Sequence, residues 1–108
     1  MPPAKFSENG TAVDSIVGAG SIIAGARVER SVVSFDVQVQ PDALIQGSVI
    51  MPSVRIGSKA ILRNVILDKN VVIEPGAQIG IDHEKDKSRF KVSENGIVVV
   101  GKGVVVTA

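Results

Sequence analysis

Aliphatic residues recur along this chain at a fixed interval. When the sequence is aligned with itself so that Ile16 falls on Val33, a shift of seventeen, twelve aliphatic positions form three columns without a gap. These columns are Ile16, Val33, Ile50 and Leu67; Ile22, Val39, Ile56 and Ile73; and Val28, Ile45, Leu62 and Ile79. A fourth column contains only Ala26, Ala43, Ala60 and Ala77. A fixed period of this kind indicates a repeat architecture.

The spacing inside each copy of the repeat predicts short strands and turns. The columns advance by six, six and five residues, which matches neither the 3.6-residue period of a helix nor a long alternating strand. Gly, Asn, Asp, Ser and Pro gather between the columns, as in Pro41-Asp42, and these residues accept tight or left-handed backbone. We therefore predict an all-β fold: a parallel β-helix over 13–81, with four coils stacked about 4.8 Å apart.

This prediction also assigns an inside and an outside to the coils. Residues in the columns, such as Ile16, Ile50, Leu62 and Ile79, are expected in the interior. Leu44 and Ile61 lie between column positions, align with each other and are expected to point outward. An outward apolar column is an exposed patch, and it predicts that the protein associates with itself.

The pattern changes at both ends of the repeat. Residues 1–12 are rich in proline and polar residues, and they are expected to form a linker or an entry strand before the first coil. Residues 82–91, DHEKDKSRFK, are expected to be a charged loop, because the columns are lost there. The run 90–106 reads as strands around an Asn-Gly turn. We expect 82–108 to form this loop and a β cap over the open end of the β-helix.

Composition narrows the functional classes. The 108 residues include no Cys, and their net charge is +1. The lack of Cys excludes a disulfide scaffold and a thiolate metal site, and it fits a reducing compartment, so the expected location is the cytoplasm. No apolar run approaches the roughly 18 residues that cross a bilayer, so no membrane partner is expected. The low net charge predicts no nucleic-acid partner either.

Candidate catalytic residues are scarce. The single histidine, His83, lies in a charged run and is interpreted as solvated. It cannot supply the three ligands of a β-helix carbonic anhydrase, and it is a poor candidate for an acyltransferase base. The glycines of 18–26 fall in the repeat, and 101–103 lacks the spacing of a P-loop. We therefore expect no catalytic residue, metal or cofactor in this chain.

Four cationic residues stand out by their positions. They are Lys69, Lys102, Arg63 and Arg89. Lys69 occupies a predicted corner of the last coil, and Lys102 lies between two glycines in the segment expected to cover that end. Each residue is interpretable as a solvated surface charge. The alternative is that they converge on an anion, since lysine and arginine are usual phosphate partners.

Several segments resemble a known family. PPAKF at 2–6, SIVGAGSIIAGARVERSVV at 15–33, VILDKNVVIEPGAQIG at 65–80 and SENGIVVVGKG at 93–103 match it in order and spacing. They resemble the C-terminal domain of ADP-glucose pyrophosphorylase, also called glucose-1-phosphate adenylyltransferase. The resemblance implies a left-handed β-helix of hexapeptide repeats, an exception to the usual right-handed crossover.

The resemblance also implies a role outside catalysis. Enzymes of this family make ADP-glucose and pyrophosphate from ATP and glucose 1-phosphate for glycogen or starch synthesis. Their chemistry lies in an N-terminal nucleotidyltransferase domain, and that domain, with its Mg²⁺ and ATP, is expected to lie outside these residues. The family's β-helix helps to build a homotetramer and to bind effectors such as sugar phosphates, AMP, ADP or phosphate.

Two effector positions of the family match residues here. The cation of its Leu-Asp-Lys-Asn motif corresponds to Lys69, and the cation after its Gly-Ile-Val segment corresponds to Lys102. Arg63 and Arg89 are candidates to join them. The expectation is a regulatory and oligomerisation domain without activity of its own. The alternative is a free-standing hexapeptide-repeat protein, such as a degenerate acyltransferase or a scaffold.

Overall fold

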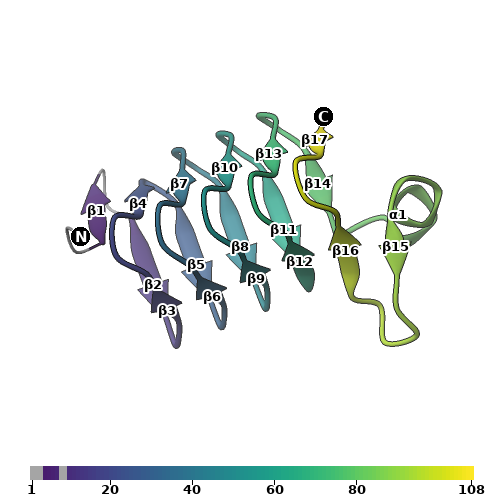
Figure 1. Ribbon diagram of the computed structural model, residues 1–108, viewed down its shortest axis with the longest axis horizontal. Coiled ribbons are helices and arrows are strands. Elements are labelled where there is room, and N and C mark those ends of the chain that lie inside the picture. Colours follow the sequence, from purple (N-terminus) through teal and green to yellow (C-terminus); the bar gives the residue numbers. More distant parts are fainter. Residues whose placement is uncertain (1–3, 8–9) are drawn as a thin grey trace.

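The protein is a stack of triangular coils. The computed structural model describes residues 4–7 and 10–108. Each regular coil adds one short strand to each of three sheets, which form the three sides of a prism (Figure 1). With the single helix α1 (His83–Arg89), the described chain is nearly all-β. The predicted fold class, a left-handed parallel β-helix, is confirmed.

The strands follow one another around the prism in a fixed order. Sheet A contains β1 (Lys5–Ser7), β4 (Ile22–Ala24), β7 (Gln38–Val39), β10 (Arg55–Ile56), β13 (Val72–Ile73) and β17 (Val105–Val106). Sheet B contains β2 (Thr11–Val13), β5 (Arg27–Glu29), β8 (Leu44–Gln46), β11 (Ile61–Arg63) and β14 (Gln78–Ile79). Sheet C contains β3 (Ile16–Val17), β6 (Val32–Val33), β9 (Val49–Ile50), β12 (Val65–Leu67), β16 (Val98–Val100) and β15 (Lys91–Val92). The pairings are parallel except that of β15 with β16.

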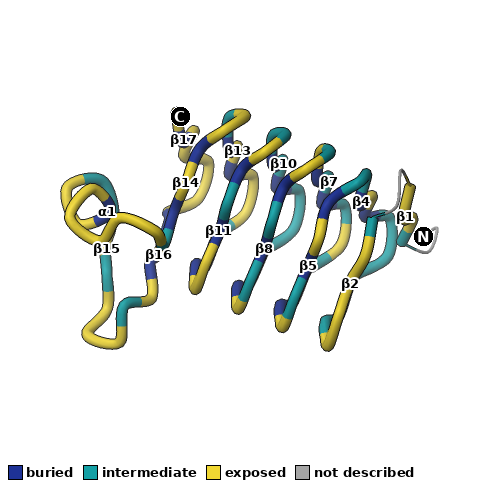
Figure 2. Tube along the Cα trace, turned by 180° about the vertical axis from the view of Figure 1, so that it is seen from behind, coloured by how far each residue is buried: buried dark blue, intermediate teal, exposed yellow. Residues whose placement is uncertain are grey.

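The interior of the prism is filled by stacked aliphatic side chains. Figure 2 shows buried segments recurring at the same places in successive coils. The inward positions of sheet B are Val28, Ile45, Leu62 and Ile79, and those of sheet C are Val33, Ile50, Leu67 and Val100. Burying each side chain contributes about 1.5–3 kcal/mol relative to leaving it in water. The aliphatic columns of the sequence are therefore the core.

One turn is shorter than the gapless alignment assumes. Strand pairing joins Val17 to Val33 and Ile23 to Val39, so the first coil is one residue shorter than the alignment requires. The later coils keep the full step, as between Leu44 and Ile61. The lost residue lies between β4 and β5, where Gly25 turns the chain with a φ of 63°.

Because of the short turn, two residues of the aliphatic columns lie on the outside of the first coil and not in its interior. Ile16 was expected inside, but it is 68% exposed, and its neighbour Val17 packs against the core instead. Ile22 is likewise exposed, and Ile23 is buried. Successive strand residues point to opposite faces, so a slip of one residue exchanges inside and outside.

The described residues before the first regular coil form strands. Residues 1–12 were predicted to be a linker or an entry strand, and within them β1 pairs with β4, and β2 pairs with β5. The stretches 4–7 and 10–12 therefore belong to the first coil, because their backbone groups pair with those of the next coil. The remainder of that prediction, on residues 1–3 and 8–9, lies outside the described residues.

The segment predicted to be a charged loop contains the helix α1. Asp82 caps the helix, because its carboxylate Oδ1 accepts a hydrogen bond from the Lys85 N–H at 3.2 Å. The first turn carries acidic residues and the last turn carries Lys87 and Arg89, which complements the helix dipole. The N-cap and the placement of acidic and basic residues thus stabilise a helix that has no hydrophobic periodicity to reveal it in the sequence.

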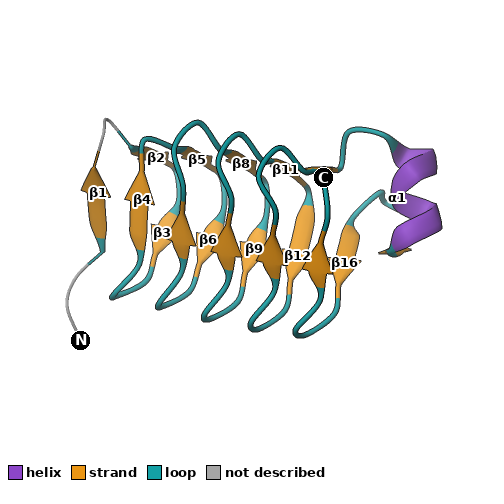
Figure 3. Ribbon diagram, turned by 90° about the horizontal axis from the view of Figure 1, so that it is seen from above, coloured by secondary structure: helices purple, strands orange, loops and turns teal. Residues whose placement is uncertain are grey.

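After this helix the repeat resumes. Val98 pairs with Val65, Val100 with Leu67 and Val105 with Val72, although the partners are separated along the chain by nearly twice the length of one coil. The expected β cap therefore consists of β16 and β17, which add a further strand to sheets C and A. We name residues 81–97 the insertion, since they stand where the coil below has only Asn64 between β11 and β12. Figure 3 shows α1 beyond the last coil.

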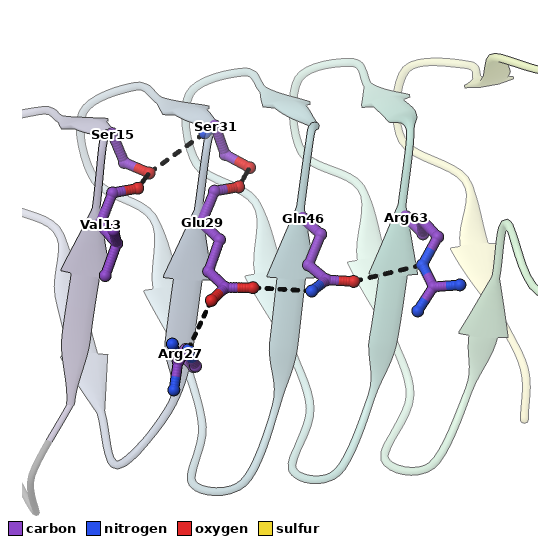
Figure 4. Close-up of polar contacts among 7 residues, drawn as sticks. All are labelled: Val13, Ser15, Arg27, Glu29, Ser31, Gln46 and Arg63. Carbon is purple, nitrogen blue, oxygen red and sulfur yellow. Dashed lines mark hydrogen bonds and ion pairs between the residues drawn. The ribbon is translucent and has the colours of Figure 1, made fainter.

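Buried serines support the corner between sheets B and C, and Figure 4 shows one of them, Ser31. The Ser31 hydroxyl donates to the Glu29 carbonyl at 2.8 Å and accepts from the Ser48 N–H at 3.0 Å. The Ser48 hydroxyl donates to the Gln46 carbonyl at 2.9 Å and accepts from the Val65 N–H at 3.2 Å. Each hydroxyl therefore links one coil to the next at the corner, where the backbone leaves the hydrogen bonds of its sheet.

Left-handed backbone recurs at the corners. Positive φ values occur at Asp14, Arg30, Asn64, Asp36, Ser53, Asn70, Asp42 and Lys59, besides glycines. Asp and Asn tolerate this conformation better than other residues that carry a Cβ. Lys59, with a φ of 62°, has no such advantage, so its corner is strained.

Candidate functional site

Lys69 and Lys102 occupy the same corner of consecutive coils. Lys69 follows β12 and Lys102 follows β16, and these two strands pair with Leu67 opposite Val100. The Gly103 N–H donates to the Lys69 carbonyl at 2.9 Å, which keeps the two corners in register. Adjacent strands lie about 4.8 Å apart, so the two side chains start about that distance from each other.

The local backbone holds both lysines on the outside. Each lysine precedes a residue with positive φ, Asn70 at 61° and Gly103 at 73°. The Asp68 carboxylate accepts the Lys69 N–H at 2.7 Å, which fixes the start of that turn. Both lysine side chains are exposed. The corner therefore presents two ammonium groups to solvent from a preformed backbone.

Neither lysine at this corner takes part in an ion pair within the described residues. Within residues 4–7 and 10–108, the ion pairs involve Arg27, Arg55 and Lys87, and neither Lys69 nor Lys102. Lys69 and Lys102 lie at equivalent turn positions of neighbouring coils, and like charges close to each other repel. An anion that contacts both ammonium groups would relieve this repulsion. The arrangement suits the binding of a phosphate or sulfate.

Arg63 belongs to a different surface. Its Nε donates to the Gln46 Oε1 at 3.2 Å, and the Gln46 Nε2 donates to the Glu29 Oε1 at 2.7 Å. Arg27 completes this polar ladder by donating to the Glu29 Oε2 at 2.7 Å (Figure 4). The hydrogen bonds from Gln46 and Arg27 hold the pKa of Glu29 below its usual value. The ladder lies along sheet B, on another side of the prism.

Arg89 is held by the C-terminal end of the chain. Its Nη2 donates to the Thr107 carbonyl at 2.8 Å, and its guanidinium lies 5.1 Å from the centre of the Phe90 ring. These contacts tie α1 to the segment after β17. The four predicted cations are therefore divided: Lys69 and Lys102 share a corner, whereas Arg63 and Arg89 are engaged by other partners.

Other classes of site find little support in the described part of the chain. No group of three or more His, Cys, Asp or Glu residues that could hold a metal occurs there. None of the described residues forms a helix with the length and apolar character needed to cross a membrane. Sequence reasoning missed a cleft beside His83, because that residue was interpreted as a solvated member of a loop.

Comparisons with known proteins identify relatives over nearly the whole chain. The family described as GlmU-like, C-terminal hexapeptide matches residues 2–100. The glucose-1-phosphate adenylyltransferase of Corynebacterium diphtheriae is 54% identical over 106 residues, covering 98% of this chain and 25% of that protein. The enzyme of the same name from Nitrosospira multiformis is 43% identical over 105 residues, covering 93% of this chain and 25% of that protein. The chain thus spans about a quarter of the length of these relatives.

Proposed function

Because the chain belongs to the GlmU-like C-terminal hexapeptide family, we propose that it is the regulatory and oligomerisation domain of a glucose-1-phosphate adenylyltransferase. The observation that carries this proposal is the stacking of Lys69 and Lys102 in one corner. These are the two positions at which the resemblance implies effector-binding cations. The name of the enzyme is that of relatives about four times as long as this chain. The alternative, a free-standing hexapeptide-repeat protein, gains no support from relatives of that length.

In this proposal the reaction belongs to a separate nucleotidyltransferase domain in the cytoplasm. That domain would convert ATP and glucose 1-phosphate to ADP-glucose and pyrophosphate, with Mg²⁺ bound there. The purified chain is expected to release no pyrophosphate from these two substrates. Turnover that survives purification and a second chromatography step would contradict this division of roles.

The effector site consists of the two stacked ammonium groups. A phosphate between them accepts a charge-assisted hydrogen bond from each, worth about 1.5–3 kcal/mol apiece. Both groups are exposed, so the attraction falls as added salt screens it. A sugar phosphate is therefore expected to bind the isolated chain weakly, in the millimolar range, because further contacts would come from the nucleotidyltransferase domain.

A chemical-shift titration with fructose bisphosphate and with sulfate tests this site. Lys69→Ala and Lys102→Ala are each expected to weaken binding. Lys59→Ala is the control, because Lys59 is an exposed corner lysine in a different turn. Arg63→Ala and Arg89→Ala are expected to leave the affinity unchanged, since other contacts hold these side chains.

Shifts that spread evenly over all surface lysines would contradict the proposed site. So would an unchanged affinity in Lys69→Ala. In either case Lys69 and Lys102 would be ordinary surface charges, although they share a corner.

The oligomerisation role is supported by an apolar face. The predicted column of Leu44 and Ile61 is aligned but only half-exposed. Sheet C presents a more continuous column, in which every coil contributes one outward aliphatic residue: Ile16, Val32, Val49, Ile66 and Val99. An uninterrupted aliphatic face along a sheet is typical of a surface that another protein surface covers.

Light scattering measures this association. The chain is expected to form a dimer or a larger species at tens of micromolar, and Val49→Lys is expected to shift it toward monomer. Gln78→Lys on sheet B is the matched control, because it adds the same charge to another outer face and Gln78 pairs with the uncharged Ile61. A strict monomer in the unsubstituted chain would contradict association by this domain alone.

A further inference from the structure

The insertion forms a cleft that the β-helix itself does not require. Residues 81–97 leave the stack after β14, and the inward column resumes at Val98, which pairs with the position of Val65. The coils therefore continue in register on both sides of the insertion. Insertions in solenoid proteins map to loops on one face, which is often the binding face.

The cleft lies between α1 and the turn that follows β15. Its volume is about 450 Å³, which is large enough for a small molecule. The polar residues that line it are His83, Lys87, Ser93, Glu94 and Asn95, with Gly96 at the turn. None of these residues belongs to the corner of Lys69 and Lys102, so the two sites share no side chain.

The helix that forms one wall is fixed from its other sides. Asp86 is buried, and its carboxylate accepts the Gly80 N–H at 2.9 Å, at the end of β14. Arg89 donates to the Thr107 carbonyl at 2.8 Å. With α1 held in this way, His83 and Lys87, which are four residues apart, lie on one side of the helix and face the cleft.

The turn that forms the other wall is closed by its own hydrogen bonds. The Gly96 N–H donates to the Ser93 carbonyl at 3.0 Å, and the Ile97 N–H donates to the Ser93 hydroxyl at 3.1 Å. That hydroxyl accepts in this bond, so its own proton is available to a ligand. Gly96 has a φ of 80°, and a Cβ there would lie 3.8 Å from the His83 Cε1, which brings the two walls close together.

We propose that this cleft binds a compact oxyanion, the phosphate of a small phosphorylated metabolite or a free phosphate ion. The donors that meet there are the Lys87 ammonium, the His83 ring N–H, the Ser93 hydroxyl and the Asn95 side-chain amide. Lys87 forms an ion pair with Glu84 at 3.9 Å, so an anion in the cleft competes with this carboxylate for the ammonium group. Glu94 is the one acidic lining residue in the described part of the chain, and its charge opposes the anion.

A single proton resonance can report this binding. His83 is the only histidine of the chain, so its ring Cε1–H signal needs no further assignment. Inorganic phosphate is titrated at constant pH, with sodium chloride added to keep the ionic strength constant. The signal is expected to move along a saturable curve. A linear or absent response at tens of millimolar phosphate would overturn the proposal.

Variants separate this site from its alternatives. Lys87→Ala is expected to weaken phosphate binding at least about tenfold, whereas Lys91→Ala on β15, which does not line the cleft, changes it less than twofold. Glu94→Gln removes the opposing charge and is expected to strengthen binding severalfold, which a purely structural role of this turn does not predict. Unchanged affinity in both Lys87→Ala and Glu94→Gln would overturn the assignment.

Two further measurements compare different phosphate ligands and separate binding in the cleft from binding at the corner of Lys69 and Lys102. Glucose 1-phosphate that binds more tightly than phosphate indicates a metabolite, and equal affinities indicate the free ion; acetate is expected to bind more weakly than either. Lys102→Ala is expected to leave the His83 response intact. If Lys102→Ala abolishes that response, the shift comes from the other corner and this proposal is wrong.

Discussion

The replacement Ser48→Ala tests how much the serine hydroxyls contribute to holding the coils together. Ser48 is 2% exposed, and its hydroxyl bonds two coils at once, as donor to the Gln46 carbonyl and as acceptor from the Val65 N–H. Val65 is completely buried, so water cannot replace the lost acceptor. The Gln46 carbonyl keeps a second partner, the Asn64 N–H at 3.0 Å.

The expected cost follows from these two bonds. A buried N–H left without an acceptor costs about 1–3 kcal/mol, and the lost bond to a carbonyl that keeps another partner costs about 1 kcal/mol. The free energy of unfolding should therefore fall by about 2–4 kcal/mol. For a domain of this size a loss of about 1 kcal/mol lowers the melting temperature by about 4–8 °C, so a fall of at least about 8 °C is expected.

Urea unfolding followed by circular dichroism measures this loss, with the slope m checked for constancy. Ser58→Ala is the matched control, because Ser58 is a corner serine whose hydroxyl takes no part in the hydrogen bonds that Ser31 and Ser48 make between coils. The reasoning is refuted if Ser48→Ala costs no more than this control. That result would mean that Val65 finds a backbone acceptor, as Val98 does when its N–H donates to the Asn64 carbonyl at 3.0 Å.

Three further outcomes are expected. Leu62→Ala empties a fully buried position and should lower the free energy of unfolding by about 2–5 kcal/mol in urea titrations; a smaller loss would mean that the core closes around it. Lys59→Gly relieves a positive φ and should raise the melting temperature, by an amount equivalent to about 0.5–1 kcal/mol; a lower value would disprove strain at this corner. Because the pKa of Glu29 is lowered in the folded protein, its contribution to stability is present above pH 4.5, its ordinary pKa, and is lost as the pH falls through the lower folded pKa. Glu29→Gln should therefore flatten the dependence of the free energy of unfolding on pH in that acid range. An unaltered pH dependence would count against the polar ladder of sheet B.

The repeat was predictable because its physical cause is periodic. Burial of one aliphatic residue per strand leaves a regular trace in the sequence, and Leu62 and Ile79 are inside as expected. The phase of the first coil was not predictable from the same trace. Ile16 is followed by Val17, and Ile22 by Ile23, so either register places aliphatic residues in the columns.

The C-terminal segment was harder to predict for two reasons. Helix α1 buries a carboxylate, Asp86, rather than an apolar stripe, so periodicity gave no signal, although the Asp82 cap did. The insertion also hid the fact that Lys69 and Lys102 are equivalent positions, since nearly two coil lengths of chain separate them instead of one. An alignment with a gap after Ile79 that spans the insertion would have found this equivalence.

The contacts of the two arginines were not predictable from spacing. Arg63 reaches Gln46 on the neighbouring strand, and Arg89 reaches the carbonyl of Thr107 near the end of the chain. Such contacts depend on how a long side chain is oriented after folding. They explain why two of the four predicted cations stand apart from the others.

The register on either side of the insertion has an engineering consequence. Gly80 continues the column of Arg63, and Val98 continues that of Val65, so a single residue could join them, as Asn64 does one coil below (Figure 1). The strands on either side of residues 81–97 are therefore in register to be joined by one asparagine or by a loop of another length. A foreign binding loop placed between β14 and β16 would be anchored at both ends by paired strands, and it would have to replace Phe90 and Val92, which pack against the core from the insertion.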